Sequence, residues 1–478
     1  MKLLAVILIV AVAATSAGKV PYGKALVEEN KKHLSKGERA NASLTHEVLI
    51  AVKQKNLDKV HKILMDVSDP SSAEYGKHLT REELASLTSN SESTSAIETY
   101  LNQNGATVIK KTQNGDYITA SASIAVWEKL FDTEFFYFTT VPYATKRKPI
   151  VTYARALEYS VDEELVPHIQ AVFNTVQLPT LITSRMPLHR ASNNRRKISS
   201  AGTITPAALK SYYNITSNIG NSLGSQSVFE TMSQTYSERD LQQFEKQYGI
   251  PTQSVDTVVG NPESDSACEW DLENCSEGNL DIEYMIGVSQ VTPTTFWYVD
   301  EPNSYLNWVI ALSDSNSPPL VNSMSYGSLE TATSDDVAEQ FSIEAMKLGT
   351  LGVSILVASG DDGVLNFDGR SGACAYQPSF PASVPFVTSI GATQGPKIDL
   401  SEIVCSSSTG GVITSGGGFS TKFTAPSWQS SAISSYFRKL KTQPVPGYSK
   451  TGRGYPDLAL TGLDYEVTIS YGIYYVSQ

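Results

Sequence analysis

Segments typical of helices and of strands alternate through residues 205–359, and this order constrains the fold more than any other feature of the sequence. Apolar β-branched runs predict strands, and apolar residues at helical spacing predict helices. The predicted elements are helix 205–213, strand 225–231, helix 238–248, helix 277–289, strand 295–299, helix 305–312, strand 320–325, helix 334–348 and strand 353–359. The alternation predicts an α/β fold with a largely parallel sheet covered by helices on both faces.

Residues 18–182 have the pattern of a separate α/β unit. Thr80 precedes the run Arg81-Glu-Glu-Leu84 and is a plausible N-cap. The other predicted elements are strand 46–53, helix 56–65, helix 93–104, strands 106–111 and 117–121, helix 125–131 and strand 135–138.

Residues 183–201 have the composition of a linker, with basic residues among Ser, Asn and Pro. Exposed polar linkers are favoured sites of proteolysis, so we expect cleavage near Arg196; an uncut interdomain linker is the alternative. The predicted organisation is a signal peptide over 1–17, a first domain over 18–182, this linker, and a second domain over 202–478.

The first 17 residues have the pattern of a secretory signal peptide. Lys2 precedes an apolar stretch that ends in Thr15, Ser16 and Ala17. The stretch is shorter than the roughly 20 residues that span a bilayer, and no later segment has the pattern of a membrane anchor. A secretory route makes the sequons at Asn41 and Asn214 usable for glycosylation.

The chain has four cysteines, Cys268, Cys275, Cys374 and Cys405. An even number in an exported chain favours disulfides. Proximity in sequence suggests Cys268 with Cys275 and Cys374 with Cys405, although three connectivities are open. The sequence contains no pattern of zinc ligands, and we expect no metal site in this chain.

The formal charge of −12 is divided unevenly. Residues 18–200 hold 24 Lys and Arg against 20 Asp and Glu, whereas residues 201–478 hold 12 against 29. Attraction between the two parts would be strong near neutrality and would fade as carboxylates take up protons. Alternatively, the acidic composition only keeps the second domain soluble in acid. There is no cationic tract for nucleic acid.

Histidine is absent from residues 201–478. A hydrolase in that part cannot use a Ser-His-Asp triad, so its base would be a carboxyl whose pKa is raised by burial or by a like-charged neighbour. Glu277 and Asp281 stand one helical turn apart at the start of helix 277–289 and fit this role. Acids also collect in first helical turns because of the helix dipole, and that alternative stays open.

Asp361 follows the predicted strand 353–359. Functional groups of parallel sheets gather at the carboxyl ends of strands, which favours a role for Asp361 in the same site. The alternative is an ordinary turn, for which Asp362-Gly363 is suited.

These features together resemble the sedolisin family of acid serine peptidases. In the first domain, Asp69-Pro-Ser-Ser-Ala-Glu-Tyr-Gly-Lys-His-Leu-Thr80 resembles the signature of the pro-kumamolisin-type activation domain. The matches in the second domain are Thr205-Pro-Ala-Ala-Leu-Lys-Ser-Tyr-Tyr213, Glu277-Gly-Asn-Leu-Asp281, Ser359-Gly-Asp-Asp-Gly363, Phe380-Pro-Ala-Ser-Val-Pro-Phe386, Ser415-Gly-Gly-Gly-Phe-Ser420 and Arg453-Gly-Tyr-Pro-Asp-Leu458.

The resemblance implies a subtilisin-like peptidase domain preceded by a ferredoxin-like prodomain that acts as inhibitor and chaperone. It also implies that Glu277 is the general base of a Ser-Glu-Asp triad, that Asp281 orients it, and that Asp361 supplies a protonated carboxyl to the oxyanion hole. The implied substrates are peptides or proteins, cleaved as a tripeptidyl-peptidase or an endopeptidase, in a lysosomal or extracellular compartment. The implied walls of the substrate cleft are Ser325, Tyr326, Gly327, Ser415, Gly416 and Gly417.

The resemblance departs from the family pattern at the nucleophile. Tyr475-Val-Ser477 matches the strand before the family's Gly-Thr-Ser, and Gln478 stands where the Gly belongs. We therefore expect a chain truncated before the nucleophile, without the calcium site of intact family members, and inactive by itself. A pseudoenzyme that binds peptides or a related peptidase is the alternative. An aspartic peptidase needs two Asp-Thr/Ser-Gly loops, and none occurs.

Overall fold

The protein is described by a computed structural model that covers residues 18–30, 33–140, 151–179, 189–190, 203–216, 223–300, 302–366, 375–395 and 402–477. It divides into two compact units, formed by residues 1–25, 35–54 and 90–177 and by residues 26–34, 55–89 and 178–478. The predicted signal peptide and the predicted cleavage site at Arg196 lie outside the described residues. Among the described residues, no helix is long and apolar enough to cross a bilayer.

The first unit is built on a four-stranded antiparallel sheet in the order β4-β5-β3-β9. Smaller sheets pair β1 with β8 and β2, β6 and β7 with one another. Central strand β3 buries Val48 and Ile50. The elements are β1 (Lys19–Lys24), β2 (Leu34–Arg39), β3 (Thr45–Val52), α4 (Ser91–Gln103), β4 (Thr107–Lys111), β5 (Tyr117–Ser123), α5 (Ile124–Phe131), β6 (Phe135–Thr140), β7 (Thr152–Ala156), β8 (Glu158–Asp162), η1 (Glu163–Leu165) and β9 (Ile169–Phe173).

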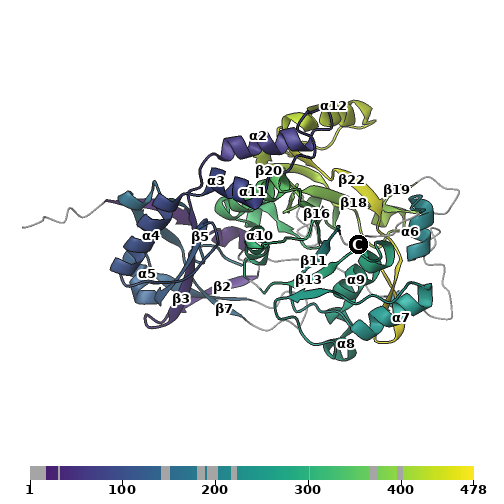
Figure 1. Ribbon diagram of the computed structural model, residues 1–478, viewed down its shortest axis with the longest axis horizontal. Helices are drawn as coiled ribbons and strands as arrows, with labels where there is room; N and C mark the ends of the chain where they lie inside the picture. Colours follow the sequence, from purple (N-terminus) through teal and green to yellow (C-terminus); the bar gives the residue numbers. More distant parts are fainter. Residues whose placement is uncertain are drawn as a thin grey trace, which may run out of the picture. The chain divides into compact units, whose positions relative to one another are not determined.

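The second unit contains an eight-stranded sheet that follows the order β12-β13-β11-β14-β16-β18-β19, with β22 also paired to β18. All pairs are parallel except β18 with β19, which confirms the predicted, largely parallel sheet (Figure 1). Its strands are β11 (Gln226–Glu230), β12 (Thr257–Val259), β13 (Thr294–Tyr298), β14 (Val321–Met324), β16 (Ser354–Ala358), β18 (Thr388–Gln394), β19 (Ile403–Val404) and β22 (Leu458–Thr461).

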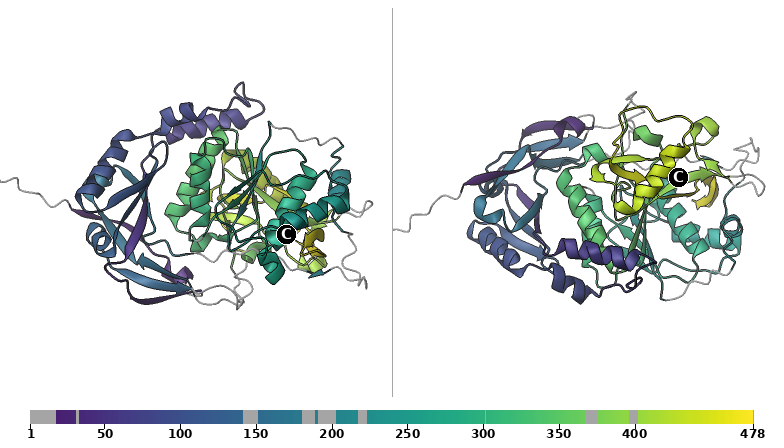
Figure 2. Two further views of the ribbon diagram at one scale, coloured as in Figure 1. Left: turned by 60° about the horizontal axis from the view of Figure 1, so that its bottom comes forward. Right: turned by 90° about the horizontal axis from the view of Figure 1, so that it is seen from above.

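Helices lie on both sides of this sheet, as predicted. Figure 2 shows α10 and α11 on one side and α7 and α9 on the other. The helices and short turns of the unit are α1 (Val27–Asn30), α2 (Leu57–Ser68), α3 (Arg81–Thr88), α6 (Pro206–Tyr212), α7 (Glu238–Tyr248), α8 (Ala267–Trp270), η2 (Leu272–Asn274), α9 (Ser276–Val288), α10 (Ser304–Asp314), η3 (Glu330–Ala332), α11 (Asp335–Thr350), η5 (Ser407–Thr409), η6 (Ser427–Gln429) and α12 (Ser430–Lys439).

Three small antiparallel arrangements complete the unit: β15 with β17, β20 with β21, and the order β10-β24-β23. Their strands are β10 (His189–Arg190), β15 (Ser328–Leu329), β17 (Ser379–Phe380), β20 (Gly418–Thr424), β21 (Gly452–Tyr455), β23 (Tyr465–Ile469) and β24 (Gly472–Val476).

Helices α2 and α3 belong by their contacts to the second unit, although they precede residue 90 in the chain. Val60, Leu64 and Leu84 form one apolar cluster with Met346 of α11. Helix α3 begins with the predicted cap, because the Thr80 hydroxyl accepts the Glu83 N–H and the Glu83 carboxylate accepts the Thr80 N–H. The domain boundaries predicted from sequence stay predictions.

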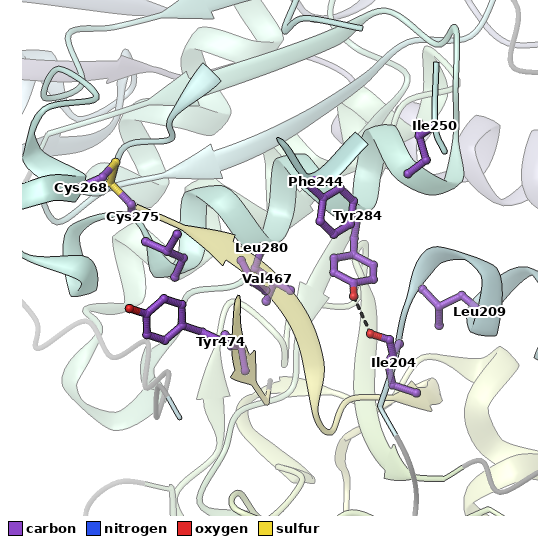
Figure 3. Packing of buried hydrophobic residues seen from close by; sticks show 12 residues of the cluster. Ile204, Leu209, Phe244, Ile250, Cys268, Cys275, Leu280, Tyr284, Val467 and Tyr474 are labelled. Carbon is purple, nitrogen blue, oxygen red and sulfur yellow. Dashed lines mark hydrogen bonds between the residues drawn. A yellow bond between two sulfur atoms is a disulfide. The ribbon is translucent and has the colours of Figure 1, made fainter. Parts of the chain in front are cut away.

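Helix α9 packs on two sides, so most of its residues are buried. Ile282 and Ile286 join a cluster with Val228 of β11 and Phe296 of β13. On the other side, Leu280 and Tyr284 join a cluster with Val467 and Tyr474 of the β23–β24 hairpin (Figure 3).

The polar residues of α9 fix the helix further. Asn279 Nδ2 donates to the carbonyl of Thr468 at 2.8 Å and to Asp240 Oδ2 at 3.2 Å. The Tyr284 hydroxyl donates to the carbonyl of Ile204 at 2.6 Å (Figure 3). The first turn of α9 is therefore held in place by a buried network as well as by apolar packing.

Candidate active site

Glu277 and Asp281 both lie in the first two turns of α9, as the spacing predicts. Glu277 is 1% exposed, and its N–H donates to Gln234 Oε1 at 3.3 Å. The Ser325 hydroxyl donates to Asp281 Oδ2 at 3.3 Å. Ser325 directly follows β14, so the start of α9 lies against the carboxyl edge of the parallel sheet.

Gly278 permits this close approach. A Cβ at this position would lie 2.3 Å from the carbonyl oxygen of Thr235, far inside van der Waals contact. Thr235 belongs to the loop that follows β11. A larger residue would force the first turn of α9, with Glu277 and Asp281, away from that loop.

Glu230 is a third carboxyl in the cluster, and the sequence analysis missed it. It is the last residue of β11 and is fully buried. The Tyr326 hydroxyl donates to Glu230 Oε2 at 2.5 Å. Because Glu230 lies inside the predicted strand 225–231, it was counted as part of the apolar run. The signal that could have found it is a charged residue at the carboxyl end of such a run.

The three carboxyls influence one another electrostatically. Burial raises the pKa of Glu230 well above its ordinary value, and the negative charges of Asp281 and Glu277 raise it further. Burial also raises the pKa of Asp281 to about 7, with the Ser325 hydrogen bond opposing the rise. The pKa of the Tyr326 hydroxyl is raised by burial and by the charge of Glu230. A proton is therefore retained in this cluster at pH values where exposed carboxyls are ionised.

Asp361 follows β16, and β16 is the parallel neighbour of β14. The main chain of this loop pairs with the segment that contains Ser415 and Gly416: the Thr414 N–H donates to the Asp361 carbonyl at 2.8 Å, and the Gly416 N–H donates to the Gly360 carbonyl at 2.6 Å. Two parts of the predicted cleft therefore adjoin predicted acids, Ser325 with Asp281 and the 414–416 segment with Asp361.

The remaining predicted cleft residues have mainly packing contacts. Tyr326 is buried against Glu230, and a Cβ at Gly327 would lie 2.8 Å from Ser379 Oγ. A Cβ at Gly417 would lie 3.2 Å from the carbonyl oxygen of Tyr455. The contacts at Gly327 and Gly417 explain why these positions have no side chain. A role in substrate binding stays a prediction for all six residues of the predicted cleft.

The structure confirms one of the two predicted disulfides. Cys268 and Cys275 form a disulfide with Cα atoms 5.3 Å apart. Cys405 is buried and forms no disulfide with a described residue; it packs with Ala392, Ile413 and Leu463. The expected bridge between Cys374 and Cys405 stays a prediction. Cys374 lies outside the described residues.

Three other predictions concern residues away from the carboxyl cluster. Ser477, 2% exposed, accepts the Asp464 N–H at 3.2 Å through its hydroxyl oxygen. Asn41 and Asn214 are exposed, and their glycosylation stays a prediction. Within the described part of the chain, no group of three or more His, Cys, Asp and Glu residues is arranged to hold a metal ion. That this chain lacks the calcium site of intact family members stays an expectation.

Comparison with known proteins decides the family. Residues 32–178 match the family model described as the Pro-kumamolisin activation domain. Tripeptidyl-peptidase 1 of Rattus norvegicus is 30% identical over 431 residues, which cover 86% of this chain and 71% of the rat protein. The chain belongs to the sedolisin family. Tripeptidyl-peptidase 1 of Homo sapiens is likewise 30% identical over 446 residues, 88% of this chain and 74% of the human protein.

A solved structure is also similar to this sedolisin. Pseudomonas sedolisin, a serine-carboxyl proteinase complexed with two molecules of pseudo-iodotyrostatin, matches 56% of this chain and 74% of its own length at 20% identity and a TM-score of 0.44. The similarity in sequence to tripeptidyl-peptidase 1 makes the chain a sedolisin-type serine peptidase by family, with an activation domain that the family model matches over residues 32–178.

Proposed function

We propose that the carboxyl cluster of the second unit, formed by Glu277, Asp281 and Glu230, belongs to a Ser-Glu-Asp peptidase site that works in acid. The cluster supplies the general base of that site and the carboxyl that orients it. The observation that carries the proposal is the meeting of Glu277, Asp281 and Glu230 at the carboxyl edge of one parallel sheet. Burial raises the pKa values of Glu230 and Asp281 there, and the charges of Asp281 and Glu277 raise the pKa of Glu230 further. Buried carboxyls whose pKa values are strongly raised are typical of functional sites, where they retain protons for catalysis.

Three carboxyls, those of Glu277, Asp281 and Asp361, have separate roles in this proposal. Glu277 accepts the proton of the nucleophilic serine and passes it to the leaving amine. Asp281, held by the Ser325 hydroxyl, orients Glu277. Asp361 in its neutral form donates a hydrogen bond to the oxyanion of the tetrahedral intermediate. A neutral Asp361 and an ionised Glu277 are both needed, so activity requires acid but falls again when the base is protonated.

No serine among the 478 residues is assigned as the nucleophile. Ser477 matches the residue before the family glycine, and its burial and its hydrogen bond to Asp464 also disfavour that role. Loss of the nucleophile lowers the rate by several orders of magnitude. We therefore expect the 478 residues to bind peptides without appreciable hydrolysis.

The activation domain is expected to inhibit the site until acid processing releases it. The positive charge of the first part and the negative charge of the second support retention near neutrality. A lysosomal or extracellular location, glycosylation at Asn41 and Asn214, and cleavage of peptides as a tripeptidyl-peptidase or an endopeptidase belong to the same proposal. A calcium ion, as in intact family members, has no role in it.

The second candidate is a pseudoenzyme that binds peptides or a related peptidase. It is favoured by the same mismatch at Ser477 and Gln478. The test is incubation of the acid-treated chain with a tripeptidyl fluorogenic substrate at about pH 4, beside the Glu277→Gln variant. Hydrolysis that the variant lacks would show that a serine in this chain does act as nucleophile. Hydrolysis that the variant keeps would refute the role of Glu277.

A further inference from the structure

The segment 260–275 leaves the carboxyl end of β12 and leads directly into α9. Because β12 is parallel to β13 and β11, this loop lies at the same edge of the sheet as Glu230. Loops at this edge contact the ligand in proteins built on parallel sheets. The loop is thus placed by topology beside the carboxyl cluster.

The loop is tied to the start of α9 through one side chain. Gln234 Nε2 donates to the carbonyl of Glu273 at 2.7 Å, and Gln234 Oε1 accepts the Glu277 N–H at 3.3 Å. The Thr235 N–H donates to the carbonyl of Asn274 at 2.9 Å. The same two residues after β11 therefore hold both the loop and the proposed general base.

Two further contacts hold the loop. The Cys268–Cys275 disulfide closes it over a separation of seven residues. Arg239 of α7 binds Glu269 at 2.6 Å and Asp265 at 3.6 Å. A loop held at both ends and on its outer side presents its remaining side chains in a defined direction.

Trp270 is 88% exposed on this anchored loop, whereas its neighbour Cys268 is 1% exposed. An indole ring that stays exposed to water on a fixed main chain lacks the large favourable free energy that its burial would provide. Exposed aromatic rings on rigid loops are typical anchors for a partner. The carboxyl cluster lies at the same edge of the sheet, and its proposed ligand is a peptide.

The surroundings of Trp270 decide which side chain it would recognise. Residues 261–276 contain five Asp and Glu and no Lys or Arg. Arg239 adds one positive charge beside Asp265 and Glu269, so the surroundings keep an excess of negative charge and an acidic side chain would be repelled. The indole face is the strongest aromatic partner for a cation. We propose that Trp270 is a specificity-determining residue whose ring stacks on a Lys or Arg side chain of the bound peptide. The proposal rests on the proposed function only in taking the ligand to be a peptide.

The test measures binding rather than hydrolysis. Fluorescein-labelled octapeptides that carry Lys at one position each, with norleucine at that position as the matched neutral partner, are titrated at about pH 5 with the acid-treated chain. Fluorescence anisotropy gives the two dissociation constants for each position. The parent chain, Trp270→Ala and Trp270→Phe are compared. Trp428→Ala is the control, because Trp428 is also exposed, at 47%, and belongs to a different segment.

For one position, the parent is expected to bind the Lys peptide about 2- to 10-fold more tightly than its norleucine partner. Trp270→Ala abolishes this preference, Trp270→Phe keeps part of it, and Trp428→Ala leaves it unchanged. Peptide binding without a Lys preference, or an unchanged preference in Trp270→Ala, would overturn the proposal for Trp270 alone. No binding of any peptide would overturn the peptide site as well.

Discussion

Replacing Asp281 by Asn tests the carboxyl cluster through the pH dependence of stability. The Asp281 carboxyl has a pKa near 3.8 in an unfolded chain and about 7 in the folded one. The folded state therefore binds more protons between these values, and its stability falls as pH rises from about 4 to about 7. At about 1.4 kcal/mol per pH unit, the full effect is roughly 4 kcal/mol. The coupling with Glu230 spreads this proton uptake over more than one group.

Asn has the shape of Asp but does not titrate, so Asp281→Asn should be about as stable as the parent at pH 4 and up to about 4 kcal/mol more stable at pH 7. Urea unfolding followed by tryptophan fluorescence at four pH values measures this difference. Four of the five tryptophans, Trp270, Trp297, Trp308 and Trp428, lie in the second unit, so the signal reports mainly on that unit.

Asp335→Asn is the control, because it removes a carboxylate whose side chain is 91% exposed and whose ion pair with Lys422 therefore contributes little to stability. It should leave the pH dependence of the unfolding free energy unchanged. If Asp281→Asn showed the same pH dependence as the parent, Asp281 would not hold a proton in the folded state near neutrality, and the electrostatic argument for the site would fail.

Three further predictions concern the start of α9 and are measured by urea unfolding at pH 5. Gly278→Ala should lower the unfolding free energy by about 1–3 kcal/mol, because its Cβ would meet the Thr235 carbonyl at 2.3 Å; an unchanged value would mean that α9 moves freely. Asn279→Ala should lower it by about 2–3 kcal/mol through the loss of buried hydrogen bonds to the Thr468 carbonyl and Asp240, whereas the exposed substitution Ser431→Ala should have no effect. Reducing Cys268–Cys275 should lower it by about 2.5 kcal/mol, and a midpoint insensitive to reductant would contradict a stabilising loop closure.

The fold of the second unit could be predicted from the sequence to a large extent. Strand 353–359 and helix 277–289 correspond to β16 (Ser354–Ala358) and α9 (Ser276–Val288), because buried parallel strands and amphipathic helices have distinct apolar periods. The position of Glu277 and Asp281 followed from the same pattern.

Other features depend on contacts between distant segments and leave no local pattern. The grouping of α2 with α11 rests on Val60 and Leu64 meeting Met346, which no local spacing reveals. Glu230 looked like the end of a strand, and only the pairing of β11 with β14 brings it beside Tyr326.

The most direct test of the central claim is equilibrium binding and cleavage of one labelled peptide by the acid-treated 478-residue chain at about pH 4. The account predicts a peptide affinity that changes between pH 4 and pH 7, as the carboxyls of the cluster ionise, while the recovered peptide stays intact. Binding with the same affinity at pH 4 and pH 7, or no binding at either, would contradict a peptide site built on these carboxyls. If the parent cleaved the peptide and Glu277→Gln did not, the role of Glu277 would be supported. The same result would show that a serine among the 478 residues does act as the nucleophile.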